Sequence, residues 1–324
     1  MIKPEDHDFF KKELESFLPD QIFDAHAHVW SHQNMLKNRT IKTLPRNGNF
    51  EEFSKMLQAL HPQRTCAANV FHRICPAEYF DSANKWTSQQ VKCDPNYRGL
   101  FLMSPDTDPE WLRKEVNRLG LSGLKCYHVY SKVNPTWEAE IPDYLPERLV
   151  QVAHQEGWVI MLHMVRPRAC ADKGNLYWIR RYCEKYPNMK LILAHSARGF
   201  QPAHNLEGLS HLRGLSNLYF DTSANCEPIA HQAIIRIIGH QKLMYGTDIP
   251  VSHLRGKSVS VGDTFLWLYE DSPVWGEKHQ SIKPVFTGLE HLRSIKWACW
   301  SENLTDNQIE DIFWNNAAKL FRLS

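Results

Sequence analysis

The sequence predicts an α/β fold of the (β/α)8 (TIM) barrel class, with eight parallel strands. Eight short runs are apolar on both faces, as in parallel strands that are covered by helices. Amphipathic segments alternate with these runs. Several runs also end in a polar residue. The predicted strands are Ile22–Val29, Thr65–Phe71, Tyr97–Met103, Gly123–Val129, Trp158–Met164, Lys190–His195, Leu218–Thr222 and Lys242–Thr247.

The segments between the runs carry the start signals of helices. Asn49 precedes an apolar helical pattern, and Glu52 stands at the third helical position, which is the arrangement of a capping box. Thr305 and Gln308 repeat this arrangement before the last helical segment. These signals predict that helices connect the strands, as the barrel requires.

The sequence predicts a short N-terminal extension, residues 1–21, and one barrel domain, residues 22–324. Within the extension, Pro4–Leu18 has the pattern of an extra helix packed outside the barrel. The connections Trp30–Asn49 and Pro250–Lys283 are too long for plain turns. Both follow a strand, so we expect long functional loops on the catalytic rim of the barrel.

The composition excludes several classes of protein. Apolar residues make up 43% and charged residues 23% of the 324 residues, as in globular domains. The formal net charge of +2 is too small for an electrostatic nucleic-acid binder. No apolar run approaches the length of a membrane span, and the first residues lack the apolar segment of a signal peptide. Eight cysteines without a CxxC pair favour buried thiols in the cytoplasm.

Histidines and one aspartate stand where predicted strands end. His26 and His28 are two residues apart at the end of the first strand, so both side chains share one face. His163, His195 and Asp248 follow the apolar runs of the fifth, sixth and eighth strands. Each of these residues alone is more often a hydrogen-bonded core or turn residue. Their joint placement on one rim predicts a catalytic metal site, most favourable for zinc, with iron, cobalt and manganese as alternatives.

Asp24 lies on the same strand face as His26 and His28. The sequence leaves two roles open for it. Asp24 either orients a histidine ligand from behind, as metal-bound histidines usually require, or is a simple buried hydrogen-bond acceptor.

The sequence resembles the amidohydrolase-related family (the amidohydrolase 2 group) of the metal-dependent hydrolase superfamily. The likeness extends from about Ile22 to Leu323, and its motifs are specific in combination. The C-terminal run Asn315-Asn316-Ala317-Ala318-Lys319-Leu320-Phe321 is similar to the closing helix of that family. The other motifs are Phe23-Asp24-Ala25-His26-Ala27-His28, Ile160-Met161-Leu162-His163, Leu193-Ala194-His195-Ser196, Phe220-Asp221-Thr222-Ser223 and Tyr245-Gly246-Thr247-Asp248-Ile249-Pro250.

The resemblance implies a barrel that holds one divalent metal. Its ligands would be His26, His28, His163 and Asp248, and His195 would face the substrate or the metal-bound water. Some relatives carry a carboxylated lysine that bridges two metals, and Lys125 in the fourth strand loosely matches that position. An unmodified lysine and a single metal are favoured, because motif matches are hypotheses and the family often has this lysine without a second metal.

These residues suggest a hydrolytic mechanism. A bound metal lowers the pKa of its water toward about 7. Asp248 is expected to move the proton to the leaving group, and His195 to hydrogen-bond the developing oxyanion.

The rim segments also carry positively charged side chains. Arg73, Arg166, Arg198 and His253 follow predicted strands, and arginine forks match carboxylate geometry. For any single arginine a solvated surface position is the more common role. Several on one rim predict a small, anionic substrate. Arg166 and Arg198 are favoured because they lie closest in sequence to the proposed metal residues.

The sequence therefore predicts a metal-dependent hydrolase of a small lactone, amide or ester bearing a carboxylate. The alternative is a metal-dependent, non-oxidative decarboxylase of an aromatic or unsaturated acid, which the same ligand set supports within the family. A sugar-acid isomerase and a non-catalytic binding barrel are further alternatives. No GxGxxG or P-loop motif indicates a nucleotide cofactor. Members of this family are often dimers, so the resemblance also leads us to expect a homodimer.

Overall fold

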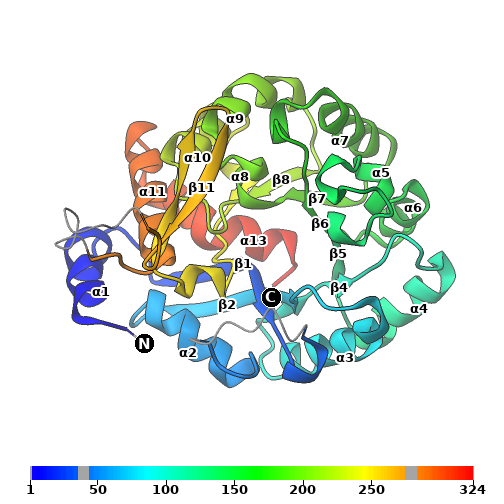
Figure 1. Cartoon of the computed structure of the whole chain (residues 1–324), viewed down its shortest axis with the longest axis horizontal. Helices are drawn as coiled ribbons and strands as arrows, with labels where there is room; N and C mark the ends of the chain where they lie inside the picture. The colour runs from blue at the N-terminus through cyan, green and yellow to red at the C-terminus, as the bar shows by residue number, and fades with distance from the viewer. Residues whose placement is uncertain (1, 36–43, 274–282, 324) are drawn as a thin grey trace.

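The computed structural model describes residues 2–35, 44–273 and 283–323. Parallel strands occupy the centre of the molecule, and helices surround them (Figure 1). The strands form a three-stranded sheet in the order β1-β2-β3 and a six-stranded sheet in the order β4-β5-β6-β7-β8-β9. The strands are β1 Gln21–Val29, β2 Thr65–His72, β3 Arg98–Gly99, β4 Phe101–Leu102, β5 Gly123–Tyr127, β6 Val159–His163, β7 Lys190–Leu193, β8 Leu218–Asp221 and β9 Leu243–Met244.

Backbone hydrogen bonds are also formed by residues next to the edge strands of the two parallel sheets. Between β3 and β4 the amide of Leu100 donates to the carbonyl of Val70 at 3.1 Å. At the other edge the amide of Ala25 in β1 donates to the carbonyl of Tyr245, just after β9, at 2.9 Å. Every predicted run thus contains a strand, and the third run contains both β3 and β4.

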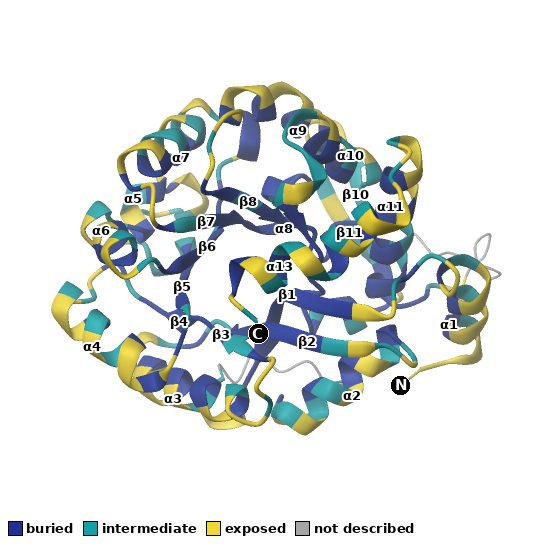
Figure 2. Cartoon of the chain, turned by 180° about the vertical axis from the view of Figure 1, so that it is seen from behind, coloured by how far each residue is buried: buried dark blue, intermediate teal, exposed yellow. Residues whose placement is uncertain are grey.

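Apart from the short, buried segment α8, the helices lie outside the strands with their polar faces in solvent, whereas the strands are buried (Figure 2). Because both faces of each strand are covered, the strands read as continuous apolar runs. The helices are α2 Phe50–Leu60, α3 Phe80–Val91, α4 Pro109–Leu119, α5 Ile141–Tyr144, α6 Glu147–Glu156, α7 Lys173–Lys185, α8 Ala194–Arg198, α9 Pro202–Gly208, α10 Pro228–Ile237, α11 Thr287–Ser301, α12 Asp306–Glu310 and α13 Asn316–Leu320.

The predicted helix caps are confirmed. The side chain of Asn49 accepts from the amide of Glu52 at 3.0 Å. Thr305 and Gln308 form both bonds of a capping box. These caps satisfy amides that the first turn of a helix leaves without a partner.

The N-terminal extension is helical from Pro4 to Leu14, four residues short of the predicted end at Leu18. It consists of α1 Pro4–Phe9 and a π-helical turn, Phe10–Leu14. Phe10 and Leu14 are buried in the main hydrophobic core. The extension therefore shares the apolar core that the strands and helices build.

The second long connection contains a hairpin where the sequence led us to expect a loop. Strands β10 Gly256–Val261 and β11 Thr264–Tyr269 pair antiparallel, with only Gly262 and Asp263 between them. Gly262 has a φ of +57°, the left-handed conformation that two-residue hairpin turns require. The Gly-Asp pair was the signal that could have predicted the hairpin. Residues 36–43 and 274–282 of the two long connections lie outside the described residues.

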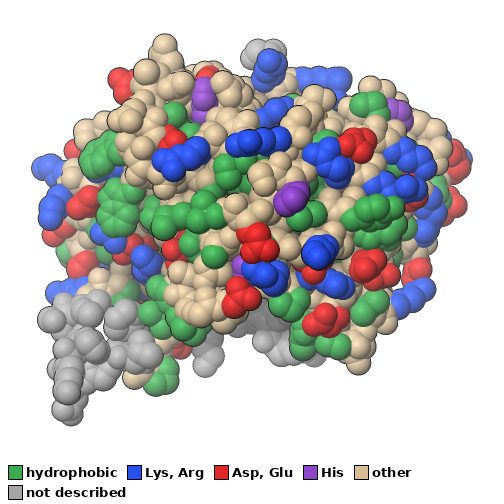
Figure 3. All heavy atoms as spheres, turned by 90° about the horizontal axis from the view of Figure 1, so that it is seen from above, with side chains coloured by type: hydrophobic (Ala, Val, Ile, Leu, Met, Phe, Trp, Pro, Cys, Tyr) green, Lys and Arg blue, Asp and Glu red, His purple; other side chains and the backbone are tan. Residues whose placement is uncertain are grey.

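Charges on the surface are mixed in sign. Basic and acidic side chains are interspersed on the face shown in Figure 3, as the net charge of +2 leads one to expect. Among the described residues, no helix combines the length and the hydropathy needed to cross a membrane.

A buried ion pair fastens the N-terminal extension to the hairpin. The guanidinium of Arg255 donates to both carboxylate oxygens of Asp6, at 3.0 and 2.5 Å, and both residues are buried. Replacing one partner of such a pair leaves a buried charge uncompensated.

We expect Asp6→Ala to lower the free energy of unfolding in urea by about 3 kcal/mol. Glu270→Gln, which breaks the exposed pair with Lys3, is the control and costs less than about 1 kcal/mol. Equal losses in both variants would contradict this.

Buried neutral histidines make stability depend on pH. Burial lowers the pKa of His61 to about 4, and its Nδ1–H and Nε2 are bonded to Leu57 and Tyr245. The unfolded chain takes up a proton near pH 6.5, whereas the folded chain does not. The contribution of neutral His61 to the free energy of unfolding is therefore fully present above pH 6.5 and is lost as the pH falls toward 4. Between pH 6 and 5 we expect a slope of about 1 kcal/mol per pH unit for each such histidine, and a shallower slope in His61→Gln. A flat profile would refute the assignment.

Candidate metal centre

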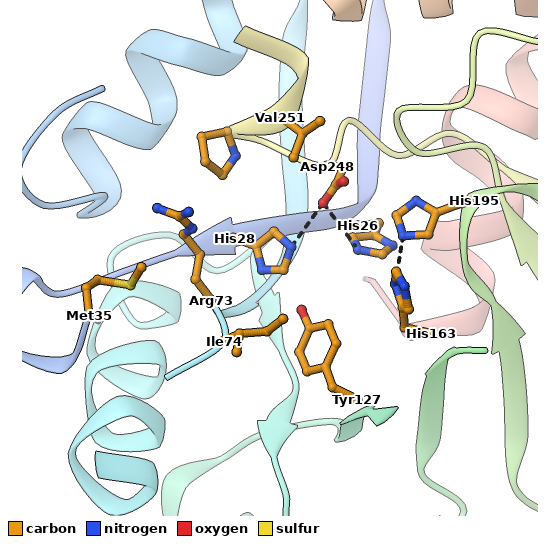
Figure 4. A pocket seen from close by; sticks show the side chains of 11 residues that line it. His26, His28, Met35, Arg73, Ile74, Tyr127, His163, His195, Asp248 and Val251 are labelled. Atoms are coloured by element: carbon orange, nitrogen blue, oxygen red, sulfur yellow. Dashed lines mark hydrogen bonds and ion pairs between the residues drawn. The ribbon is translucent and has the colours of Figure 1, made fainter. Parts of the chain in front are cut away.

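Three predicted ligands converge at the ends of β1 and β9 (Figure 4). Nε2 of His28 lies 3.0 Å from Oδ1 of Asp248, and Nε2 of His26 lies 3.7 Å from the same oxygen. One donor atom from each residue lies within 4.8 Å of the other two, and all three residues are buried. Two imidazoles and a carboxylate form a donor set that suits zinc and other first-row divalent metals. The structure thus brings His26, His28 and Asp248 together.

The backbone around Asp248 is fixed by β1. The amide of Asp248 donates to the carbonyl of His26 at 2.7 Å, and Asp248 has a φ of +56°. The carboxylate of Asp24 accepts from the amide of Thr247 at 2.8 Å and from that of His26 at 3.0 Å. These bonds hold the residue before Asp248 against the strand that carries the histidines.

Asp24 accepts hydrogen bonds from backbone amides and the Thr247 hydroxyl, and from no histidine ring among the described residues. Of its two predicted roles, the structure places it as a buried hydrogen-bond acceptor. The register between β1 and β2 shifts between Asp24 and Ala27, which breaks the simple alternation on which the other role depended.

Asp221 occupies the position behind the ligand that was considered for Asp24. Its Oδ2 accepts from Nδ1–H of His26 at 2.9 Å, which fixes the tautomer and leaves Nε2 of His26 toward Asp248. Its Oδ1 accepts from the amides of His195 and Ser223, both at 3.1 Å. Asp221 ends β8 and is the next-to-last residue of the seventh predicted strand, Leu218–Thr222. The rule that selected the other site residues could therefore have identified it.

His163 and His195 also lie at the site. Nδ1 of His163 is 3.1 Å from Nε2 of His195, while Nδ1 of His195 is 2.9 Å from the carbonyl of Ser223. A carbonyl only accepts, so Nδ1 of His195 carries the proton and its Nε2 accepts from His163. This leaves the lone pair of His163 on Nε2. His163 is not among the three tightly grouped donors, and its role as fourth ligand stays a prediction.

His195 was predicted as the last residue of a strand, but β7 ends at Leu193. Residues His195 to Arg198 all have φ between +53° and +59°, a short left-handed turn. Such conformations are costly for residues other than glycine and persist where the surroundings hold them. The hydrogen bond from the backbone amide of His195 to the carboxylate of Asp221 is one of the contacts that hold this turn.

The protonation states of the site suit a metal. Burial, reinforced by the charge of Lys125, lowers the pKa of His26 to about 3, so this imidazole is neutral. Burial by itself raises the pKa of Asp248, but the hydrogen bond with His28 and the nearby histidines outweigh it and bring the pKa below the ordinary value. Neutral imidazoles and an ionised carboxylate are the states that bind metal. Nδ1 of His28 is buried and has no hydrogen-bond partner among the described residues.

Lys125 lies within the site. Its Nζ is 3.3 Å from Nε2 of His26 and 4.4 Å from the ring centre of Phe71. Burial lowers the pKa of Lys125 to about 8. The position beside a ligand nitrogen agrees with the predicted location, whereas its carboxylation stays a prediction.

A cavity of about 200 Å³ opens beside these residues. Arg73 lines it and is the predicted substrate-binding residue that the structure brings to the metal centre. Figure 4 shows Arg73 on one side of His28 and Asp248 on the other. The full lining is His26, His28, Met35, Arg73, Ile74, Tyr127, His163, His195, Asp248, Pro250 and Val251.

Arg166, Arg198 and His253 were predicted to bind substrate but are not part of this lining. Arg166 pairs with Asp172 at 3.3 Å, and Arg198 donates to the carbonyl of Arg166 at 3.0 Å. The ring of His253 is packed 5.0 Å from that of Phe286. Asp172 is only 6 residues from Arg166, but the contact of Arg198 with Arg166 spans 32 residues. The position of these residues after a strand therefore did not show whether they line the cavity.

Solved structures of similar fold come from several enzymes. A probable 2-pyrone-4,6-dicarboxylic acid hydrolase from Acinetobacter baumannii, with citric acid bound, is 15% identical with a TM-score of 0.59, over 93% of this chain and 99% of that chain. 5-Carboxyvanillate decarboxylase from Novosphingobium aromaticivorans, complexed with manganese and 4-hydroxy-3-methoxy-5-nitrobenzoic acid, is 13% identical with a TM-score of 0.58, over 94% and 96%. 4-Oxalomesaconate hydratase from Rhodopseudomonas palustris is 14% identical with a TM-score of 0.58, over 93% and 95%.

At these identities the solved structures establish a likeness of fold alone. The search of curated proteins found no match. The family model described as amidohydrolase matches residues 23–323. This match covers nearly the whole chain and includes every residue of the metal centre described above. The chain therefore belongs to the amidohydrolase family.

Proposed function

We propose that the protein is a metal-dependent hydrolase that acts on a small lactone, amide or ester bearing a carboxylate. The observation that carries the proposal is the convergence of His26, His28 and Asp248 on one point beside a cavity. The membership in the amidohydrolase family supports the same chemistry.

A divalent metal would be held by His26, His28 and Asp248, with His163 as the predicted fourth ligand. Zinc is our first choice for this donor set, and manganese, the metal of the decarboxylase structure of similar fold, is an alternative. When bound, such a metal acts as a Lewis acid, which polarises a substrate carbonyl and lowers the pKa of a bound water toward about 7.

Asp248 is our candidate for proton transfer. Its Oδ1 is directed to the two histidines, whereas its Oδ2 accepts no hydrogen bond from the described residues. The residue lines the cavity, so Oδ2 can take a proton from the attacking water and pass it to the leaving group.

His195 is a positioning residue in this proposal. Its Nε2 accepts from Nδ1–H of His163, so it would need a second proton before it could donate to an oxyanion. The hydrogen-bond pattern therefore favours orientation of His163 over the oxyanion role that the sequence suggested.

Decarboxylation of an aromatic or unsaturated acid is the second candidate. Arg73 lines the cavity together with the metal residues, which favours a substrate carboxylate close to the metal. In a hydrolase that carboxylate would be retained, and in a decarboxylase it would leave as carbon dioxide. Measuring carbon dioxide release against ring or amide opening distinguishes the two reactions.

We also propose that the two parallel sheets form one closed barrel of eight strands, with β3 and β4 as parts of the same strand. The hydrogen bonds from Ala25 to Tyr245 and from His28 to the carbonyl of Ile249, both 2.9 Å, support the closure. In such a barrel the metal residues lie at the carboxyl ends of the strands, where catalytic residues are found.

Replacing Asp248 should abolish turnover while the fold is kept. With saturating zinc or manganese, we expect Asp248→Asn to lower kcat/KM about 10²- to 10⁴-fold, because proton transfer loses its base. The assay follows opening of carboxylated lactones, esters and amides, including 2-pyrone-4,6-dicarboxylate, and circular dichroism checks the fold. Asp263→Asn, an exposed carboxylate in the hairpin turn, is the control and retains activity. Activity of Asp248→Asn near that of the unchanged protein would remove Asp248 from the mechanism.

Asp221 should control metal affinity through His26. We expect Asp221→Asn to weaken zinc or manganese binding about 10- to 100-fold, since the ring loses its charged partner. Isothermal titration calorimetry measures the dissociation constant. Asp311→Asn is a matched control, because it removes the partner of His240, 3.2 Å away, outside the metal centre. If both variants bound metal as tightly as the unchanged protein, Asp221 would have no role in ligation.

A further inference from the structure

Tyr127 brings a hydroxyl group without a partner into the cavity. The residue ends β5 and is only 5% exposed. Among the described residues, no group hydrogen-bonds its hydroxyl oxygen. A buried hydroxyl without a partner is destabilising, so such groups in native proteins call for an explanation.

The Tyr127 ring stands between histidines of the metal centre. Its ring centre lies 6.5 Å from that of His28, with the planes nearly parallel at 20°, and 5.9 Å from that of His163. Figure 4 shows the hydroxyl end of Tyr127 directed toward His28, and both residues line the cavity. A ligand bound in the cavity beside the predicted metal would therefore lie close to this hydroxyl.

The chemistry of the lining indicates which group meets the hydroxyl. A phenol that keeps its proton at neutral pH donates one hydrogen bond, so the ligand must supply an acceptor. Among the described residues of the same lining, Arg73 is the one Lys or Arg side chain and brings a positive charge. Met35, Ile74 and Val251 are apolar. An anionic oxygen acceptor on a compact apolar body fits these surroundings.

We propose that Tyr127 and Arg73 together bind one carboxylate of the substrate. The phenol donates to one carboxylate oxygen, and the guanidinium supplies the opposite charge. This subsite deepens the proposed function, on which it rests, by assigning the substrate carboxylate to the His28 side of the metal centre. The cavity of about 200 Å³ suits a body of the size of a single six-membered ring.

Binding of benzoate and of benzamide by the full-length, manganese-loaded protein tests the subsite. These probes share one ring, but only benzoate carries the anionic acceptor. We expect benzoate to bind and benzamide to bind at least about tenfold more weakly, because hydrogen bonds to charged groups are stronger. Isothermal titration calorimetry measures both. Failure of benzoate to bind, or equal affinity for the two probes, would overturn the proposal.

Tyr127→Phe removes the hydroxyl and keeps the ring. We expect its affinity for benzoate to fall about tenfold, while its affinity for manganese stays unchanged. Its thermal midpoint without ligand should equal or exceed that of the unchanged protein, because a buried group without a partner is removed. Tyr144→Phe makes the same change at a fully buried tyrosine outside the cavity lining and should bind benzoate normally.

Arg73→Gln is the second variant and should also weaken benzoate binding about tenfold. Unchanged benzoate affinity in Tyr127→Phe would overturn the subsite, even if Asp248→Asn abolished turnover as expected. Conversely, turnover that survives in Asp248→Asn would contradict the proposed function and would leave the benzoate measurements valid. The two failures are thus distinguishable.

Discussion

The metal centre depends on one buried carboxylate, that of Asp221 at the end of β8. It accepts from the ring of His26 and from the amides of His195 and Ser223, and the Ser223 hydroxyl adds a bond of 2.5 Å. Burial alone would raise the pKa of Asp221, but the hydrogen bonds that it accepts from the His26 ring and from Ser223 outweigh this effect and hold the pKa below its ordinary value, so the group stays ionised. One side chain thus connects β1, β8 and the turn after β7, because only full satisfaction of its oxygens makes a buried charge tolerable.

The left-handed turn from His195 to Arg198 follows from the same constraint. Four successive residues with positive φ are costly, so bonds from outside the turn must hold them. The side chain of Asn205 donates to the carbonyl of Ser196 at 2.8 Å, and the Ser196 hydroxyl lies 2.7 Å from Nδ1 of His231. The result of this strain is that His195 turns toward His163 instead of continuing the strand.

Local signals predicted most of the fold, and non-local contacts account for what they missed. The strands and the helix caps at Asn49 and Thr305 depend on residues that are neighbours in the sequence, so they could be predicted from it. His26, His28 and Asp248 were predictable because each follows an apolar run. The pairing of Asp221 with His26 spans 195 residues, and no spacing rule reaches that far. The sequence favoured Arg166 and Arg198 for substrate binding because they lie closest in sequence to the proposed metal residues, but of the three arginines only Arg73 lines the cavity.

The charges around the cavity give an independent reason for an anionic substrate. Lys125 and Arg73 are cationic, Asp221 and Asp248 are anionic, and burial keeps His26 neutral. A divalent metal would add two positive charges to this set of groups. Since the site is largely shielded from water, this added charge is poorly screened. A substrate carboxylate offsets part of it, whereas a neutral substrate would leave it uncompensated. Lys125 and Tyr127 share one face of β5, so a single strand places a cation beside His26 and a hydrogen-bond donor in the cavity.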